Sequence, residues 1–370
     1  MLTSIRIQNF RSIRDAQVKL GQVNLFIGPN NSGKSNFLKG IELFSESIFT
    51  LPKRKEITLQ HFSKIFTRGA KRSNPFAAIE FDVIFSDIQY GNYAKFKHIV
   101  QTPTSETKDA SLVESLEISE SDEAIYNGHE FSGEAAYKAG AVILKDFLSG
   151  SKVYRPDPGK FIHSESIESD DYLNSDCSNL VSFLFNLGQN HKKKFQQLET
   201  DLKTCVGNID SLSTPAEPGS RGRIKLKFFD QNGYDFWAEE VSEGVLYFLA
   251  LLCIIHQPHP PKILLLEEPE KGIHPRRIKE VMDFIFELAR LRDIQIIITS
   301  HSPYVVDHFA DMPECISVFD RENSETVIHN AADLIEKTNE EYAAQGLPPT
   351  SYKDSLGEYW LSGFLGGVPL

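Results

Sequence analysis

The segment from Gly28 to Ser35, GPNNSGKS, constrains the fold of this chain more than any other stretch. It fits the pattern G-x-x-x-x-G-K-[ST], in which glycines permit a tight loop whose backbone N–H groups surround phosphate oxygens. Residues 23–27 before it are apolar except for Asn24 and predict a buried strand, and residues 36–44 after it carry apolar side chains at helical spacing. A strand, this loop and a helix in succession predict a phosphate-binding unit.

The residue types in this unit predict which ligand it holds. The start of the helix adds partial positive charge, Lys34 can reach the β- and γ-phosphates, and the Ser35 hydroxyl can bind Mg²⁺. We therefore expect ATP and Mg²⁺ as cofactors. The alternative is a Gly- and Asn-rich turn that matches by chance, which the flanking strand and helix disfavour. Further nucleotide contacts are predicted at Gly28, Asn30, Asn31, Ser32, Gly33 and Asn36.

Composition narrows the class of protein. The 370 residues allow one large or two ordinary domains, and 41% hydrophobic with 24% charged residues is typical of a soluble globular protein. Because no apolar run reaches the ~18 residues of a membrane span and no signal peptide is evident, we expect a cytoplasmic protein without a membrane partner. The net charge of −12 argues against a protein that coats nucleic acid. The cysteines form no C-x-x-C pair, which argues against a disulfide framework and a zinc site.

Periodicity predicts an α/β fold with an antiparallel β lobe, a parallel core sheet and a short helical insertion. Residues 1–20 alternate as a hairpin that turns between Asn9 and Asp15, and residues 50–75 look like a basic surface connection. Continuous apolar runs at 263–266 and 294–298 are typical of buried parallel strands. Further strands are predicted at 77–85, 95–101, 111–118, 124–131 and 224–229, and helices at 134–148, 178–187, 191–206, 245–255 (apolar on all sides) and 277–291.

These elements divide the chain into four parts. We expect an N-terminal lobe at 1–133, a helical insertion at 134–219, a C-terminal lobe at 220–325 and a tail at 326–370. The tail is apolar and Gly-rich near its end. It can pack on the core of the lobes or bind a partner.

Polar residues follow each predicted core strand. In open α/β sheets, ligands bind at the carboxyl ends of the strands. Glu267 follows four apolar residues and is placed to hold Mg²⁺, often through water, and Glu268 can polarise the attacking water as general base. A surface acidic turn is the alternative for this pair, and the phosphate loop upstream disfavours it.

His301 and Ser242 complete the candidate site. His301 follows a core strand directly and can sense or stabilise the γ-phosphate, the alternative being a structural histidine. Ser242 precedes the apolar helix, where a serine is a good N-cap. At a helix end it can also bind a γ-phosphate that a second subunit presents.

Together these motifs resemble the ATP-binding-cassette (ABC) ATPases of the RecF/SMC/OLD group, often labelled AAA-type ATPases. The resemblance covers about 1–100 and 220–325 and is specific in the combination of its motifs. The matching segments are IQNFRSI (7–13, an "NF(R/K)S" start), 28–35 (Walker A), VSEG (241–244, a reduced signature), LLLEEPE with HP (264–270 and 274–275, Walker B and D-loop) and SHSP (300–303, the switch histidine).

The resemblance implies a head-to-tail homodimer or larger homo-oligomer. Two ATP molecules would lie between one subunit's Walker A and the other's signature serine. It implies that Lys34 and Ser35 bind phosphate and Mg²⁺, that Glu267 supports Mg²⁺, and that Glu268 is the catalytic base. His301 would be the switch, and Ser242 would act on the partner's ATP. Glu243 stands where transporters usually carry glycine, which weighs against a transporter cassette.

Several alternatives stay open on the sequence alone. The chain carries no acidic triad of a nuclease after its last ATPase strand, so we expect a separate nuclease or toxin effector, most plausibly in a two-component anti-phage defence system. The alternatives are a RecF-like DNA-binding repair ATPase and a scaffold that binds ATP but barely hydrolyses it. The basic runs 191–194 and 221–225 would then contact DNA, or are simply exposed faces. Arg11 touches nucleotide or DNA, or is solvated, and Gln60 and Gln101 are weak candidates for the Q-loop glutamine.

Overall fold

A six-stranded, mostly parallel sheet forms the centre of the molecule, in the order β18-β17-β3-β16-β15-β9. Only the pair β17–β18 is antiparallel. The strands are β3 (Val23–Ile27), β9 (Val153–Tyr154), β15 (Ile263–Glu267), β16 (Gln295–Thr299), β17 (Ile316–Glu322) and β18 (Glu325–Asn330). The computed structural model describes residues 1–50, 78–87, 92–101, 111–118, 123–126, 129–132, 147–148, 150–168, 170–349, 352–353 and 355–368.

Side-chain alternation along these strands separates two hydrophobic cores. On β3, Phe26 faces one core, whereas Leu25 and Ile27 face the other. The first core lies beneath α1 (Lys34–Thr50) and the hairpin of β1 (Leu2–Phe10) and β2 (Ile13–Lys19). The second contains α7 (Glu243–Ile255), α8 (Pro275–Arg292) and α9 (Pro303–Asp307). The sheet is therefore covered on both faces, as the predicted α/β class requires.

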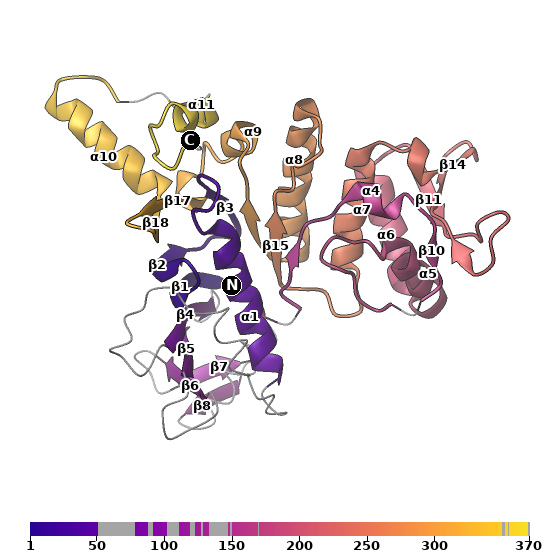
Figure 1. The fold of residues 1–370 in the computed structure, drawn as a ribbon, viewed down its shortest axis with the longest axis horizontal. Coiled ribbons are helices and arrows are strands. Elements are labelled where there is room, and N and C mark those ends of the chain that lie inside the picture. The colour runs from indigo at the N-terminus through magenta and orange to yellow at the C-terminus, as the bar shows by residue number, and fades with distance from the viewer. Residues whose placement is uncertain are drawn as a thin grey trace.

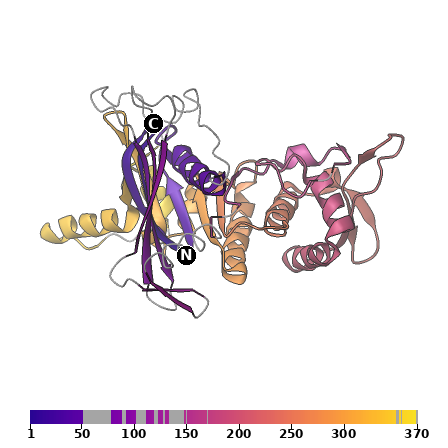
Figure 2. The same ribbon diagram turned by 90° about the horizontal axis from the view of Figure 1, so that it is seen from below.

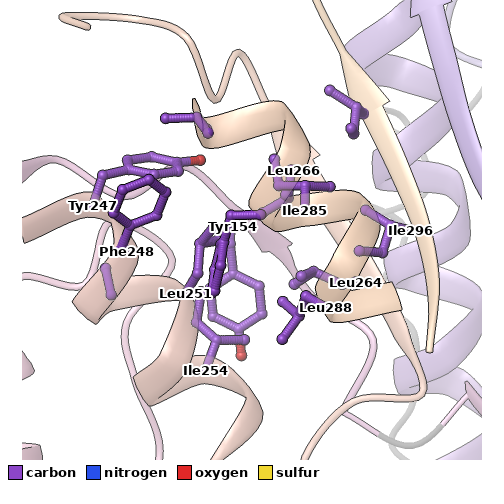
Figure 3. Close-up of a cluster of buried hydrophobic side chains, with 14 of the residues drawn as sticks. Tyr154, Tyr247, Phe248, Leu251, Ile254, Leu264, Leu266, Ile285, Leu288 and Ile296 are labelled. Carbon is purple, nitrogen blue, oxygen red and sulfur yellow. The ribbon is translucent and has the colours of Figure 1, made fainter. Parts of the chain in front are cut away.

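Helix α7 is buried on nearly every side, as its composition predicts. All of its residues from Leu246 to Ile255 are buried. Figure 3 shows Leu251 and Ile254 of this helix beside Leu264 of β15 and Leu288 of α8. Because the helix is apolar all round, it needs neighbours on every side.

The antiparallel lobe is a five-stranded sheet in the order β2-β1-β4-β5-β6. The predicted hairpin is confirmed, with Phe10 paired to Ile13 across the turn. One expectation is wrong: residues 124–131 form two short paired strands instead of one, because the chain reverses between them. The remaining strands are β4 (Ala78–Asp87), β5 (Asn92–Gln101), β6 (Ser111–Ile118), β7 (Glu123–Tyr126) and β8 (His129–Ser132).

The middle of the chain folds as helices and short strands on the side of the core sheet away from the antiparallel lobe (Figures 1 and 2). The predicted helices at 178–187 and 191–206 are confirmed as α5 (Leu180–Asn190) and α6 (Lys192–Cys205). The predicted strand at 224–229 is interrupted and forms two strands. Of the predicted helix at 134–148, only the helical residues 147–148 are described, and the predicted connection at 50–75 lies outside the described residues beyond Thr50. The other elements are α4 (Pro158–Phe161), β10 (Glu165–Ser166), β11 (Ile209–Ser213), β12 (Arg223–Ile224), β13 (Lys227–Asp230), β14 (Asp235–Trp237) and the 3-10 turn Ala238–Glu240.

The C-terminal segment packs on the core, which resolves one of the alternatives left by the sequence. Trp360 of α11 (Leu356–Leu361) is fully buried and donates from its indole to the Gly367 carbonyl. A Cβ on Gly357 would lie 2.3 Å from the Pro303 carbonyl oxygen, so α11 and α9 are in close contact. Helix α10 (Ala331–Ala344) instead projects from the body (Figure 2). Among the described helices, none is both long and apolar enough to cross a bilayer. The four-part division of the chain stays a prediction.

Replacing Gly28 by alanine should destabilise the fold strongly. Gly28 has a φ of +140°, and an added Cβ would lie 2.0 Å from the Phe319 carbonyl oxygen on β17. Strain and overpacking together should lower the free energy of unfolding by about 2 to 5 kcal/mol, measured by chemical denaturation without nucleotide. Gly207→Ala is the matched control, because no atom lies within 4 Å of its added Cβ. Its change should stay within about 0.5 kcal/mol, and equal losses in both variants would contradict the explanation.

Candidate functional site

The loop between β3 and α1 takes the conformation that its glycines permit. Gly28, Asn31 and Gly33 all have positive φ angles, which glycine and asparagine adopt most readily. A Cβ on Gly33 would lie 2.3 Å from the Thr326 hydroxyl oxygen of β18. Strands β17 and β18 therefore press against the loop from outside, and only glycine fits at both contacts.

Lys34 lies inside this loop. It is 6% exposed, and its Nζ donates to the carbonyl oxygens of Gly28 at 2.8 Å and Pro29 at 2.9 Å. Burial lowers the pKa of Lys34 to about 8, although the carboxylates of Glu268 and Glu267 raise it. The loop thus holds an ammonium group at its centre, and a change of pH near 8 changes the protonation of that group.

Glu267 ends strand β15 and faces the start of α1. The Ser35 hydroxyl donates to its Oε1 atom. The same Oε1 forms an ion pair with Arg155 Nη2 at 2.9 Å. A serine hydroxyl and a carboxylate side by side are oxygen ligands of the kind that Mg²⁺ prefers.

Glu268 follows in a left-handed backbone conformation, with a φ of +49°. Its N–H donates to the Thr299 carbonyl at 2.9 Å, which fixes the turn beside β16. His301 Nε2 lies 3.6 Å from Glu268 Oε1, beyond hydrogen-bond distance. Burial lowers the pKa of His301, as does the nearby Lys34 ammonium, while Glu268 raises it. The imidazole is therefore neutral at pH 7.

Glu270 joins the turns after β15 and β16. Its Oε1 accepts from the Ser300 hydroxyl at 2.6 Å and from the His301 N–H at 3.2 Å. Burial raises the pKa of Glu270, although both hydrogen bonds lower it. Glu270 is a positioning residue, because it ties the backbone of His301 to the segment that carries Glu268.

The segment around Arg11 contacts the other side of the loop. Asn36 donates to the Ser12 hydroxyl at 2.9 Å and accepts from Arg11 Nη1 at 3.2 Å. Ser12 and Thr326 share a hydrogen bond of 3.0 Å between their hydroxyls. The predicted phosphate-loop asparagine is therefore engaged by the N-terminal hairpin, and Arg11 supports it.

These segments enclose a cleft of about 280 Å³. The Thr299 hydroxyl, 1% exposed, borders the cleft without a hydrogen-bond partner among the described residues. A buried polar atom without a partner, beside an ammonium and two carboxylates, fits a site for a polyanion and its cation. The lining residues are Asn30, Asn31, Ser32, Gly33, Lys34, Ser35, Asn36, Arg155, Glu267, Glu268, Thr299 and His301.

Ser242 lies apart from this cleft. It is exposed at the N-terminus of α7, and its hydroxyl makes no capping bond. Instead its oxygen accepts from Arg277 Nη1 of α8 at 2.9 Å. The expected N-cap position is confirmed, while the side chain is held by an arginine that the sequence did not single out.

The sequence also missed Arg155 and Thr299. Both lie at carboxyl ends of core strands, so the rule that located Glu267 and His301 applies to them as well. The two-residue strand β9 before Arg155 is too short to show periodicity. The Q-loop candidates are not in the cleft as described: Gln101 ends β5 in the antiparallel lobe, and Gln60 lies outside the described residues.

A parallel sheet with this loop and this set of carboxyl-end residues defines a P-loop ATPase. A family model described as "AAA ATPase domain" matches residues 1–206. A second, described as "AAA domain, putative AbiEii toxin, Type IV TA system", matches residues 107–307. Each match spans more than half of the 370 residues. The chain therefore belongs to the AAA ATPase domain family.

Known proteins agree with this family. The chain is 24% identical over 187 residues to the energy-coupling factor transporter ATP-binding protein EcfA2 of Bacillus subtilis (strain 168), over 50% of this chain and 63% of that protein. The chain thus spans less than two thirds of that curated relative. The SMC head domain from Thermotoga maritima aligns with a TM-score of 0.52 at 12% identity, over 89% of this chain and 98% of that one. An SMC head bound to the C-winged helix domain of ScpA aligns with a TM-score of 0.54 at 15% identity, over 89% of this chain and 96% of that one. These structures share the fold.

Nucleotide affinity should fall as the pH rises through the pKa of Lys34. The sequence predicts that this ammonium binds phosphate, and with a pKa of about 8 it is mostly lost by pH 9. The affinity for ADP, measured by calorimetry, should therefore drop about tenfold between pH 7 and pH 9. Lys39→Gln, an exposed lysine on α1, is the control and should keep this profile. An affinity that stays constant to pH 9 would show that Lys34 does not titrate there.

Proposed function

We propose that the chain binds ATP with Mg²⁺ and hydrolyses it slowly to ADP and phosphate, in a homodimer or larger homo-oligomer that ATP closes. The convergence of Lys34, Glu267 and Glu268 on one cleft carries the proposal. Membership of the ATPase family supports nucleotide binding and hydrolysis in general terms.

The side chains of the cleft divide the work. Lys34 binds the phosphates, and Ser35 with Glu267 holds Mg²⁺, which when bound neutralises phosphate charge. Glu268 accepts a proton from the attacking water. His301 donates a hydrogen bond to the γ-phosphate, which its neutral imidazole and its distance of 3.6 Å from Glu268 support.

The position of Ser242 supports a composite site. Its hydroxyl is exposed beside the Arg277 guanidinium, at the N-terminus of a 13-residue helix. A hydroxyl, an arginine and a helix N-terminus are all suited to phosphate, yet Ser242 does not border the cleft of its own chain. The phosphate that it binds would therefore belong to a nucleotide held by a second copy.

We further propose a biological role as the sensor or scaffold of a two-component anti-phage defence system. The effector, a nuclease or toxin, would be a separate chain. The description of one matching family model names a toxin of a type IV toxin–antitoxin system, which is also a two-component setting. The role rests on family analogy, and a nuclease-like or toxin-like gene beside this one would support it.

The DNA-binding alternative has less support from the basic runs. Lys194 donates to the carbonyl oxygens of Gln257 and Pro258, and Lys225 pairs with Glu239 at 2.6 Å. Side chains that are engaged within the chain contribute less to a phosphate-binding surface. DNA binding by the chain alone that requires ATP and weakens steeply with salt would favour this alternative.

Replacing the base should trap the ATP-bound oligomer. In Glu268→Gln the bound nucleotide should persist, so ATP with Mg²⁺ should raise the mass measured by light scattering from one chain to a dimer or larger assembly. Adding Ser242→Arg should abolish the rise in mass, because the larger arginine side chain would fill the space that the partner's phosphate needs beside residue 242. Ser166→Arg, at an exposed serine of β10, is the control and should leave the rise intact.

Two results would count against this mechanism. If the mass is fixed without ATP, the oligomer is constitutive and nucleotide acts within a scaffold. If Ser166→Arg and Ser242→Arg behave alike, Ser242 has no special place at the interface.

A further inference from the structure

We propose that Arg155 distinguishes nucleoside triphosphates from diphosphates, by leaving Glu267 for the terminal phosphate when Mg²⁺ binds. This inference rests on the proposed function of the cleft. It concerns a residue at the end of β9 to which neither the sequence motifs nor the family comparison gives a role.

The first step is competition for one carboxylate oxygen. Glu267 Oε1 accepts a hydrogen bond from the Ser35 hydroxyl and forms an ion pair with Arg155 Nη2. Ser35 and Glu267 are also the residues proposed to hold Mg²⁺. A guanidinium and a divalent cation repel each other at such short range, so Mg²⁺ on Glu267 weakens the hold of that carboxylate on Arg155.

The second step is the freedom of the side chain on a fixed backbone. Arg155 follows Tyr154, which pairs with Leu266 of β15, and its N–H donates to the Ser175 carbonyl at 2.7 Å. Pro156 follows and restricts the backbone of Arg155 further. The side chain, by contrast, is 48% exposed. The Arg155 side chain can therefore change partner while its backbone stays beside the cleft.

The third step is chemical fit. A guanidinium presents parallel N–H groups that bind phosphate oxygens in pairs. Arg155 follows β9, whereas Lys34 begins α1 after β3, and β15 and β16 lie between these two strands in the sheet. A diphosphate lacks the terminal group. Arg155 therefore gains a phosphate partner with a triphosphate and gains none with a diphosphate.

Arg155→Ala tests the inference by binding rather than by turnover. With Mg²⁺ present, calorimetry should show the affinity for a non-hydrolysable ATP analogue falling at least about tenfold, the usual size of a charged hydrogen bond. The affinity for ADP should change less than about twofold. Less Mg²⁺ should be needed for ADP binding, because the competing cation has gone. Arg155→Lys, which keeps the charge but loses the paired N–H groups, should recover part of the lost affinity for the ATP analogue.

Two further variants make the outcome specific. Lys152→Ala removes a cation from the same segment, one that donates to the Leu173 carbonyl and does not line the cleft. It should leave both affinities unchanged. Lys34→Ala should weaken both nucleotides together. Melting temperatures of all variants show whether each is folded. If Arg155→Ala is not folded, the affinities of Arg155→Lys decide the test instead.

The results separate the two proposals. If the wild-type protein binds neither nucleotide, the proposed function fails and the inference with it. If it binds both, but Arg155→Ala weakens them equally or not at all, the inference is wrong and the nucleotide site stands.

Discussion

Parallel pairing of the core strands is the constraint on which the site depends. Thr299 of β16 pairs with Phe26 of β3 on one side and Glu267 of β15 on the other, and Tyr154 of β9 pairs with Leu266. This register brings the residues after each strand to one edge. A slip of one residue would turn every side chain to the opposite face and exchange the two cores. The two hydrophobic layers therefore set the geometry of the polar cleft as well as holding the fold together.

Within that edge, three of the charged side chains already have partners in the protein. Lys34 is held by loop carbonyls, Glu267 by a hydroxyl and a guanidinium, and Glu270 by a hydroxyl and an N–H. A half-buried charge without a partner is costly. Ligand binding at such a site is an exchange of partners, and its free energy is a difference between two well-compensated states.

Much of the fold and of the candidate site was predictable, because the residues that indicate them are continuous in the sequence. A dozen or so consecutive residues are enough to predict each of three features: the phosphate loop, the acidic pair Glu267 and Glu268, and the apolar helix α7. The misses have a common physical cause. Arg155 follows a strand of two residues whose place is set only by its pairing with β15. The fit of Gly33 against Thr326 and the burial of Trp360 likewise depend on segments distant in sequence. The roles of the site residues, and the division into lobes, stay predictions.

The pairing of β3 also constrains how the protein comes into being. Its neighbours are β16 and β17, so Val23 must wait for Ile296 to be synthesised before they can pair. At ribosomal rates of about 5–20 residues per second, that wait is roughly 14 to 55 s. Throughout that time, a mostly apolar strand lacks both of its partners, and such unpaired strand edges are prone to aggregate. Contacts this distant in sequence also fold slowly. The fold thus favours slow, late assembly, in which a chaperone that shields the early strand would have the most to contribute.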